Sequence, residues 1–228
     1  AGEGMQITKT SQKNFPKTSL RSKNSRKKLS SRNLQIKFSK KILPALSISL
    51  TTIEADAKDI ALVKDVLKLS PNAAVTINGE ISAADANIIA KSETVAGAGA
   101  GALTATIKAG SVAATLKAIK DVKVGDVIKF KTTDTSVDAS DLVDLAAKVD
   151  TLDASSVKTI TSATEVDVVA ALAIVEDANV TITGNVAVTG IKAILEATTG
   201  KVTATLDAGS AVDIAEALAD DKVNAINV

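Results

Sequence analysis

The chain has 228 residues, of which 46% are hydrophobic and only 1% aromatic, so a sizeable core can be built almost entirely from Ala, Val, Ile and Leu. It contains no Cys and no His, which excludes disulfides, thiolate metal sites and the catalytic or zinc sites that depend on histidine. The net charge of +1 conceals two regions. Residues 1–50 hold twelve basic groups and one acid, whereas residues 51–228 hold fifteen basic groups and twenty-five acids.

The first region is rich in Ser, Lys and Asn and shows neither helical nor strand periodicity. Such a segment buries too little apolar surface to offset the entropy cost of ordering it. We therefore expect a disordered basic arm or a targeting segment at residues 1–50, followed by a folded domain at residues 51–228.

Three roles remain open for this arm. It can be an inert solvated tail, or it can bind a polyanion such as nucleic acid non-specifically, by counterion release. It can also be a leader for export or organelle import, because an apolar run at 42–50 precedes Ala55-Asp56-Ala57, which resembles a signal-peptidase site. No run approaches the ~18 apolar residues of a membrane-spanning helix. The candidate polyanion contacts are Arg21, Lys23, Arg26, Lys27, Lys28 and Arg32.

From residue 56 the chain becomes periodic, with a Ser, Thr or Asp opening a short amphipathic stretch about every 25 residues. The opener's side-chain oxygen can accept a backbone N–H of the first helical turn, and an acid three residues later complements the positive helix end. Each stretch predicts a helix of about three turns. The openers are Asp56, Ser82, Ser111, Asp138, Thr164, Thr189 and Ser210.

A strand-like run with alternating apolar and polar residues follows each helix. The apolar positions are expected to face the helices, and the Thr, Lys or Asn positions are expected to face water. The predicted strands cover residues 75–78, 103–107, 127–131, 157–161, 180–183, 202–206 and 223–227.

One strand and one helix per unit predict an α/β fold, a right-handed βα solenoid of about seven units with one parallel sheet. A doubly wound sheet is the alternative, but its strands are buried on both faces and read as continuous apolar runs. The last predicted strand reaches Val228 without a polar cap, so we expect a fragment of a longer array or end-to-end or edge-to-edge pairing with another copy.

Thr-x-Thr pairs recur on four of the predicted strands. Stacked in register, they would form a flat array of hydroxyl and methyl groups, as in ice-binding solenoids, although ordinary β-propensity on a solvated strand face is the favoured explanation. The candidate strand-face contacts are Thr104, Thr106, Thr159, Thr161, Thr181, Thr183, Thr203 and Thr205.

The stretches 137–145 (VDASDLVDL) and 152–161 (LDASSVKTIT) resemble the Ala/Asp/Thr/Val-rich repeats of very large surface and secreted proteins of marine cyanobacteria, and the likeness covers roughly residues 56–228. The resemblance implies a structural or adhesive module outside the cell or on its surface. We therefore expect a non-enzymatic spacer that contacts a protein or polysaccharide, without catalytic residues, cofactor or metal. Polyanion or particle binding through the arm and ice binding are the alternatives.

Overall fold

The computed structural model describes residues 6–9, 50–92, 101–219 and 224–228. Within these ranges the strands form two sheets. The first sheet contains, in spatial order, β1 (Gln6–Lys9), β2 (Leu50–Asp56), β3 (Ala74–Ile81), β4 (Leu103–Ile107), β5 (Val127–Lys131) and β7 (Thr151–Asp153). The second contains β6 (Ser136–Asp138), β8 (Thr159–Ser162), β9 (Asn179–Val186), β10 (Val202–Leu206) and β11 (Ala225–Asn227).

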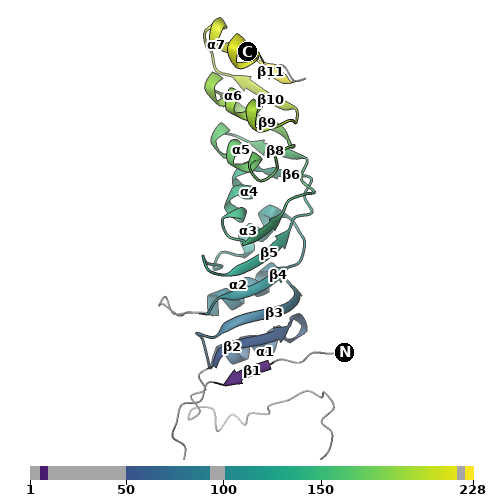
Figure 1. Cartoon of the computed structure of the whole chain (residues 1–228), viewed down its shortest axis with the longest axis vertical. Coiled ribbons are helices and arrows are strands. Elements are labelled where there is room, and N and C mark those ends of the chain that lie inside the picture. Colours follow the sequence, from purple (N-terminus) through teal and green to yellow (C-terminus); the bar gives the residue numbers. More distant parts are fainter. Residues whose placement is uncertain (1–5, 10–49, 93–100, 220–223) are drawn as a thin grey trace, which may run out of the picture.

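Seven α-helices alternate with the strands in the described part of the chain, and each contacts the next one along the sequence. Figure 1 shows the resulting stack, which runs from β2 and α1 at one end of the long axis to α7 and β11 at the other. The helices are α1 (Ile60–Leu67), α2 (Ala83–Ser92), α3 (Val112–Ala118), α4 (Ala139–Ala146), α5 (Glu165–Leu172), α6 (Val188–Ala197) and α7 (Ala211–Ala217), and a 3-10 turn at Ala57–Asp59 precedes α1.

Parallel pairing joins each strand to its neighbours from β2 onward, which confirms the α/β class with parallel sheets. The alternation of buried and exposed residues is also confirmed, most regularly in β5, whereas β4 alternates buried with half-buried residues. The ladders place buried aliphatic residues in columns, for example Ile53, Val75 and Leu103 in the first sheet. Because each layer presents similar aliphatic side chains to the next, the core needs few aromatic rings.

The prediction of one sheet is wrong, and the break lies in the middle of the stack. β5 and β6 belong to one pass of the chain, before α4, whereas β7 and β8 belong to the next pass, after α4. β5 pairs with β7 in the first sheet, and β6 pairs with β8 in the second. The two sheets therefore overlap over two layers.

Side-chain hydrogen bonds hold the corner between β5 and β6. Thr132, which is fully buried, donates from Oγ1 to the Gly110 carbonyl at 3.1 Å and accepts the Asp134 N–H at 3.1 Å. The Asp134 carboxylate accepts the Val112 N–H at 2.7 Å, and Ser156 Oγ donates to the Thr132 carbonyl at 2.7 Å. Because side chains satisfy these backbone groups, the chain can turn from one sheet into the other without leaving them unpaired.

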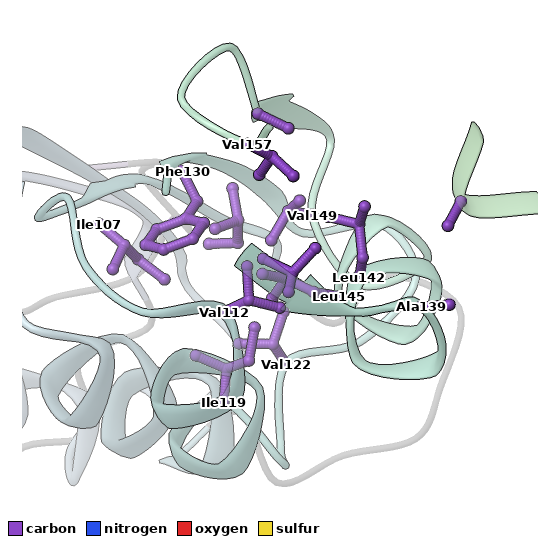
Figure 2. Packing of buried hydrophobic residues seen from close by; sticks show 14 of the residues in the cluster. Ile107, Val112, Ile119, Val122, Phe130, Ala139, Leu142, Leu145, Val149 and Val157 are labelled. Atoms are coloured by element: carbon purple, nitrogen blue, oxygen red, sulfur yellow. The ribbon is translucent and has the colours of Figure 1, made fainter. Parts of the chain in front are cut away.

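The apolar stripes of α1 to α6 are buried, as Ile60, Val63 and Leu67 of α1 illustrate. In α7 only Ala217 of the stripe is buried, and Ile214 is half-buried. The core lies between these helices and the sheets. Figure 2 shows Phe130, the one aromatic residue within the described ranges, directed into this core together with Ile107 and Val112.

Three of the seven predicted openers make the expected side-chain cap. Ser82 Oγ accepts the Asp85 N–H at 3.0 Å, Asp138 accepts the Ser140 N–H at 2.9 Å, and Ser210 accepts the Asp213 N–H at 3.1 Å. Thr164 and Ser111 occupy the N-cap position without such a bond, and Asp56 lies at the end of β2 before the 3-10 turn. Thr189 is wrong as an opener, because α6 begins at Val188 after an Ala187 N-cap.

Four strands were not predicted: β1, β2, β6 and β7. The predicted strand at 157–161 begins only at Thr159, and residue 223 of the last predicted strand lies outside the described residues. Within residues 1–50, Gln6–Lys9 form β1 and pair antiparallel with β2, and Leu50 is the first residue of β2. The remainder of the predicted arm lies outside the described residues.

Candidate functional site

The six candidate polyanion contacts lie outside the described residues. They are Arg21, Lys23, Arg26, Lys27, Lys28 and Arg32. The candidate cleavage site lies in the folded part, where Ala55 is 1% exposed within β2. Cleavage after Ala57 would therefore remove the whole of β2 and leave β3 as the edge of the first sheet.

The eight Thr residues of the expected array do not form one surface. Thr161, Thr181 and Thr203 align in one column across β8, β9 and β10, and Asp138 and Ala225 lie at the two ends of this column. Thr104 and Thr106 lie in the other sheet, where their partners on β5 are Val127 and Lys129.

The other Thr residues of the second sheet do not align with one another. Thr159 aligns with Asn179, and Thr205 aligns with Asn185 rather than with Thr183, because the register of β9 and β10 shifts between these positions. Thr183 donates from Oγ1 to the Ser162 carbonyl at 3.3 Å. The hydroxyl of Thr161 is also used within the stack, since it donates to the Val137 carbonyl at 3.1 Å. These two hydroxyls stabilise contacts between successive layers.

Asparagine side chains link the layers as well, and the sequence reading did not identify them. Asn179 Oδ1 accepts the Lys201 N–H at 2.8 Å, and Asn224 Oδ1 accepts the Val202 N–H at 3.0 Å. Asn179, at the start of β9, and Asn224, just before β11, reach the backbone at the start of β10. The recurrence of Asn at strand starts was the available signal.

Among the described residues, two ion pairs bridge successive layers. Lys64 of α1 lies 2.7 Å from Asp85 of α2, and Lys131 of β5 lies 2.8 Å from Asp153 of β7. Hydrogen bonds from Lys64 and then Ser82 hold the pKa of Asp85 below its usual value. Those from Lys131 and then Ser155 lower the pKa of Asp153 as well. Both carboxylates are therefore charged near neutral pH and stabilise the packing of successive layers through their ion pairs.

Acidic residues are concentrated in the second half of the folded region. Residues 134–219 contain fourteen Asp and Glu residues and four Lys residues, whereas residues 51–133 contain nine acids and ten Lys residues. Of the fourteen acids, only Asp153 has a basic partner within 4 Å among the described residues. This half of the molecule therefore carries a negative charge that its own Lys residues do not neutralise.

A surface hollow of about 500 Å³ lies within this acidic half, between α5 and α6. Leu172 and Thr198 of its lining are buried, and Val169 is 39% exposed. Three exposed acids belong to the same lining. They are Glu176, Asp177 and Glu196, and Asp177 accepts the Thr199 hydroxyl at 2.5 Å. The hollow thus combines apolar surface with uncompensated carboxylates.

Within the described ranges, no three acidic side chains are grouped so that they could hold a metal ion. No described helix is long and apolar enough to cross a bilayer. Comparison of the chain with protein-family models, curated proteins and solved structures finds no match.

Proposed function

We propose that the chain is a non-enzymatic structural and interaction module, a right-handed βα solenoid that acts as a rigid spacer outside the cell or on its surface. The observation that carries this proposal is the order of the contacts, because strands pair and helices pack with their neighbours along the chain. Such nearest-neighbour packing gives an extended surface from repeated units. The sheet face or the helical face is the surface that contacts a protein or polysaccharide.

The chemistry of the side chains supports a structural role. The chain has no His and no Cys, so an enzyme would have to work with Lys, Ser, Thr, Asp and Glu alone. In the described part, Asp85 and Asp153 pair with Lys residues of the preceding layer, and Asn179 binds the backbone of the following one. These polar groups stabilise the stack.

Deletion of one layer tests the architecture. Ser136 pairs with Thr159, so joining Ser136 directly to Ile160 removes residues 137–159 in register. The shortened chain is expected to unfold cooperatively and to have a smaller hydrodynamic radius. Deletion of Ala139–Ala146 alone is the control, because it removes α4 without its strand and exposes the core. Loss of folding in both variants would contradict the solenoid.

Binding of immobilised neutral polysaccharides tests the interaction role. In the column of Thr161, Thr181 and Thr203, the hydroxyls of Thr181 and Thr203 are suited to bind sugar hydroxyls, because the Thr161 hydroxyl already donates to the Val137 carbonyl. The double variant Thr181→Val and Thr203→Val keeps the side-chain shape, and we expect it to bind more weakly than the unaltered chain. Equal binding would exclude this column as the contact surface.

Polyanion binding through the arm is the second candidate function, favoured by the twelve basic groups against one acid in residues 1–50. Binding to duplex DNA should weaken steeply between about 50 and 200 mM salt, because each phosphate contact releases a counterion. Replacing the six candidate contacts by Gln should flatten this salt dependence. An unchanged slope would exclude them as phosphate contacts.

Export is tested by the N-terminal sequence of the protein isolated from its natural source. A start before Leu50 keeps β2 in the mature protein, whereas a start at Lys58 removes it. Recovery of the unprocessed leader inside the cell would contradict export.

A further inference from the structure

The hollow between α5 and α6 has the features of a docking site for a basic, partly apolar peptide. Val169 and Ala173 give it apolar surface from the α5 side, and Ala197 gives it apolar surface from α6. Glu176 and Glu196 add negative charge to the lining and have no basic partner within 4 Å in the described part. A side chain of Leu or Phe flanked by Lys or Arg would match both properties.

The chain itself contains one segment of this chemistry. Residues 10–49 hold eleven basic groups and no acid, and several large apolar residues interrupt the basic ones. Leu34, Ile36 and Phe38, for example, lie between Arg32 and the Lys40-Lys41 pair. Its positive charge complements the fourteen acids and four Lys residues of residues 134–219.

We propose that the hollow between α5 and α6 docks the basic segment 10–49 of the same chain. The inference goes beyond the spacer function and does not depend on it. If the segment docks there, a polyanion and the hollow compete for the Lys and Arg residues of segment 10–49.

The segment is long enough to reach the hollow from its own chain. It is anchored by β1 at Lys9 and by β2 at Leu50. Five strand-to-strand steps separate β2 from β9, taking β7 and β8 as one layer, which is about 24 Å at the usual spacing between neighbouring strands. Forty residues extend to about 130 Å, so the segment can reach the hollow and return.

Tethering favours the same chain over a second copy. A covalent tether to the same chain gives an effective local concentration of about 1 mM, which exceeds the concentration of other copies in a micromolar solution. The hollow is therefore filled by its own arm in dilute solution.

Zero-length carbodiimide coupling of carboxylates to lysines, mapped by mass spectrometry on the full-length chain, tests the proposal. At about 1 µM protein and low salt, where screening is weak, we expect the Lys residues of segment 10–49 to couple preferentially to Glu176, Asp177 and Glu196. Coupling is expected within one chain and should not increase with protein concentration. Coupling spread evenly over the exposed acids would overturn the proposal, and so would coupling found only between chains.

A matched pair of variants tests the role of the hollow's charge. Glu176→Gln with Glu196→Gln removes two carboxylates from the hollow, and coupling at the remaining Asp177 should fall about threefold to tenfold. Glu54→Gln with Glu80→Gln removes the same charge from β2 and β3, and coupling at Asp177 should not change. An equal fall in both variants would show a general electrostatic attraction instead and would overturn docking at this site.

Duplex DNA provides the competition test on the unaltered chain. Saturating DNA is expected to reduce coupling at Asp177, because the phosphates occupy the basic groups of the segment. Undiminished coupling in the presence of bound DNA would contradict the shared use of these groups.

Discussion

The Lys64 ammonium lies 2.7 Å from Oδ1 of Asp85 and joins α1 to α2 across two successive layers. The other carboxylate oxygen of Asp85 accepts the Ser82 hydroxyl at 2.7 Å, while Ser82 Oγ accepts the Asp85 N–H at 3.0 Å. One carboxylate therefore completes the cap of its own helix and binds the preceding helix. The Asp85 carboxylate thus takes part both in the bond within its own unit, to Ser82, and in the bond to the preceding unit, to Lys64.

The pH dependence of stability should show this contact. Hydrogen bonds from Lys64 and Ser82 lower the pKa of Asp85 in the folded chain, so the carboxylate stabilises the fold above its unfolded pKa of about 3.9. The stabilisation is lost as the pH falls through the lower, folded pKa. Asp85→Asn should therefore cost stability at pH 7 and progressively less toward pH 2. Both side chains are partly exposed, so the expected difference is below about 1 kcal/mol.

Denaturant unfolding at both pH values measures this difference. The double-mutant cycle with Lys64→Met isolates the part that depends on the ion pair. A cost of Asp85→Asn that stays the same at the two pH values would show that the carboxylate charge contributes nothing.

Two serines at equivalent helix starts test the cap alone. Ser82→Ala removes the acceptor of the Asp85 N–H and should cost about 1 kcal/mol of unfolding free energy. Ser111 precedes α3 without a side-chain cap bond, so Ser111→Ala should cost little in the same measurement. Equal losses at the two positions would contradict a specific role of the Ser82 bond.

Local periodicity predicted most of the elements because it depends on residues close in sequence. The alternation in Leu103–Ile107 and the stripe of Ile60, Val63 and Leu67 required no information from other layers. The change of sheet could not be predicted in this way. It depends on the bonds of Thr132 and Asp134 to Gly110 and Val112, each of which joins residues 22 positions apart in the chain.

The candidate sites depended on register, which the sequence pattern did not provide. The Thr-x-Thr pairs have the correct spacing along each strand, but the bulge in β9 places Thr205 opposite Asn185. The hollow lies where α5 and the residues after it meet the end of α6, so its lining comes from two units. A pattern within one unit cannot indicate such a juxtaposition.

Close packing at the β9 bulge gives another prediction. A Cβ atom at Gly184 would overlap the backbone carbonyl oxygen of Ala163 in the preceding unit. Because this oxygen belongs to the backbone, it can move away only if the chain around Ala163 shifts as well. Gly184→Ala should lower the free energy of unfolding by about 1–3 kcal/mol. A Cβ at Gly110 would meet no atom closer than 3.9 Å, so Gly110→Ala should be neutral or slightly stabilising. Thermal unfolding of the two variants compares them, and a tolerated Gly184→Ala would show that the layers are less tightly packed.

Truncation of a central core residue tests whether neighbouring layers unfold together. Leu142 of α4 is fully buried, and α4 contacts both α3 and α5. Leu142→Ala should cost about 2.5–5 kcal/mol, because it removes buried apolar surface and leaves a cavity that adjacent units cannot fill without moving. Val166 on the outer face of α5 is 75% exposed, so Val166→Ala should change stability by less than about 0.5 kcal/mol.

The shape of the transition distinguishes a coupled stack from independent units. If the layers on both sides of α4 depend on its packing, Leu142→Ala shifts the whole denaturant transition to lower concentration with an unchanged slope. If the stack separates at α4, the variant shows two transitions, and the slope of each is smaller because each exposes less surface. In each sheet, a strand that precedes α4 pairs with a strand that follows it, β5 with β7 and β6 with β8. This overlap of the two sheets favours a single shifted transition. Two separate transitions in the unaltered chain would contradict this coupling.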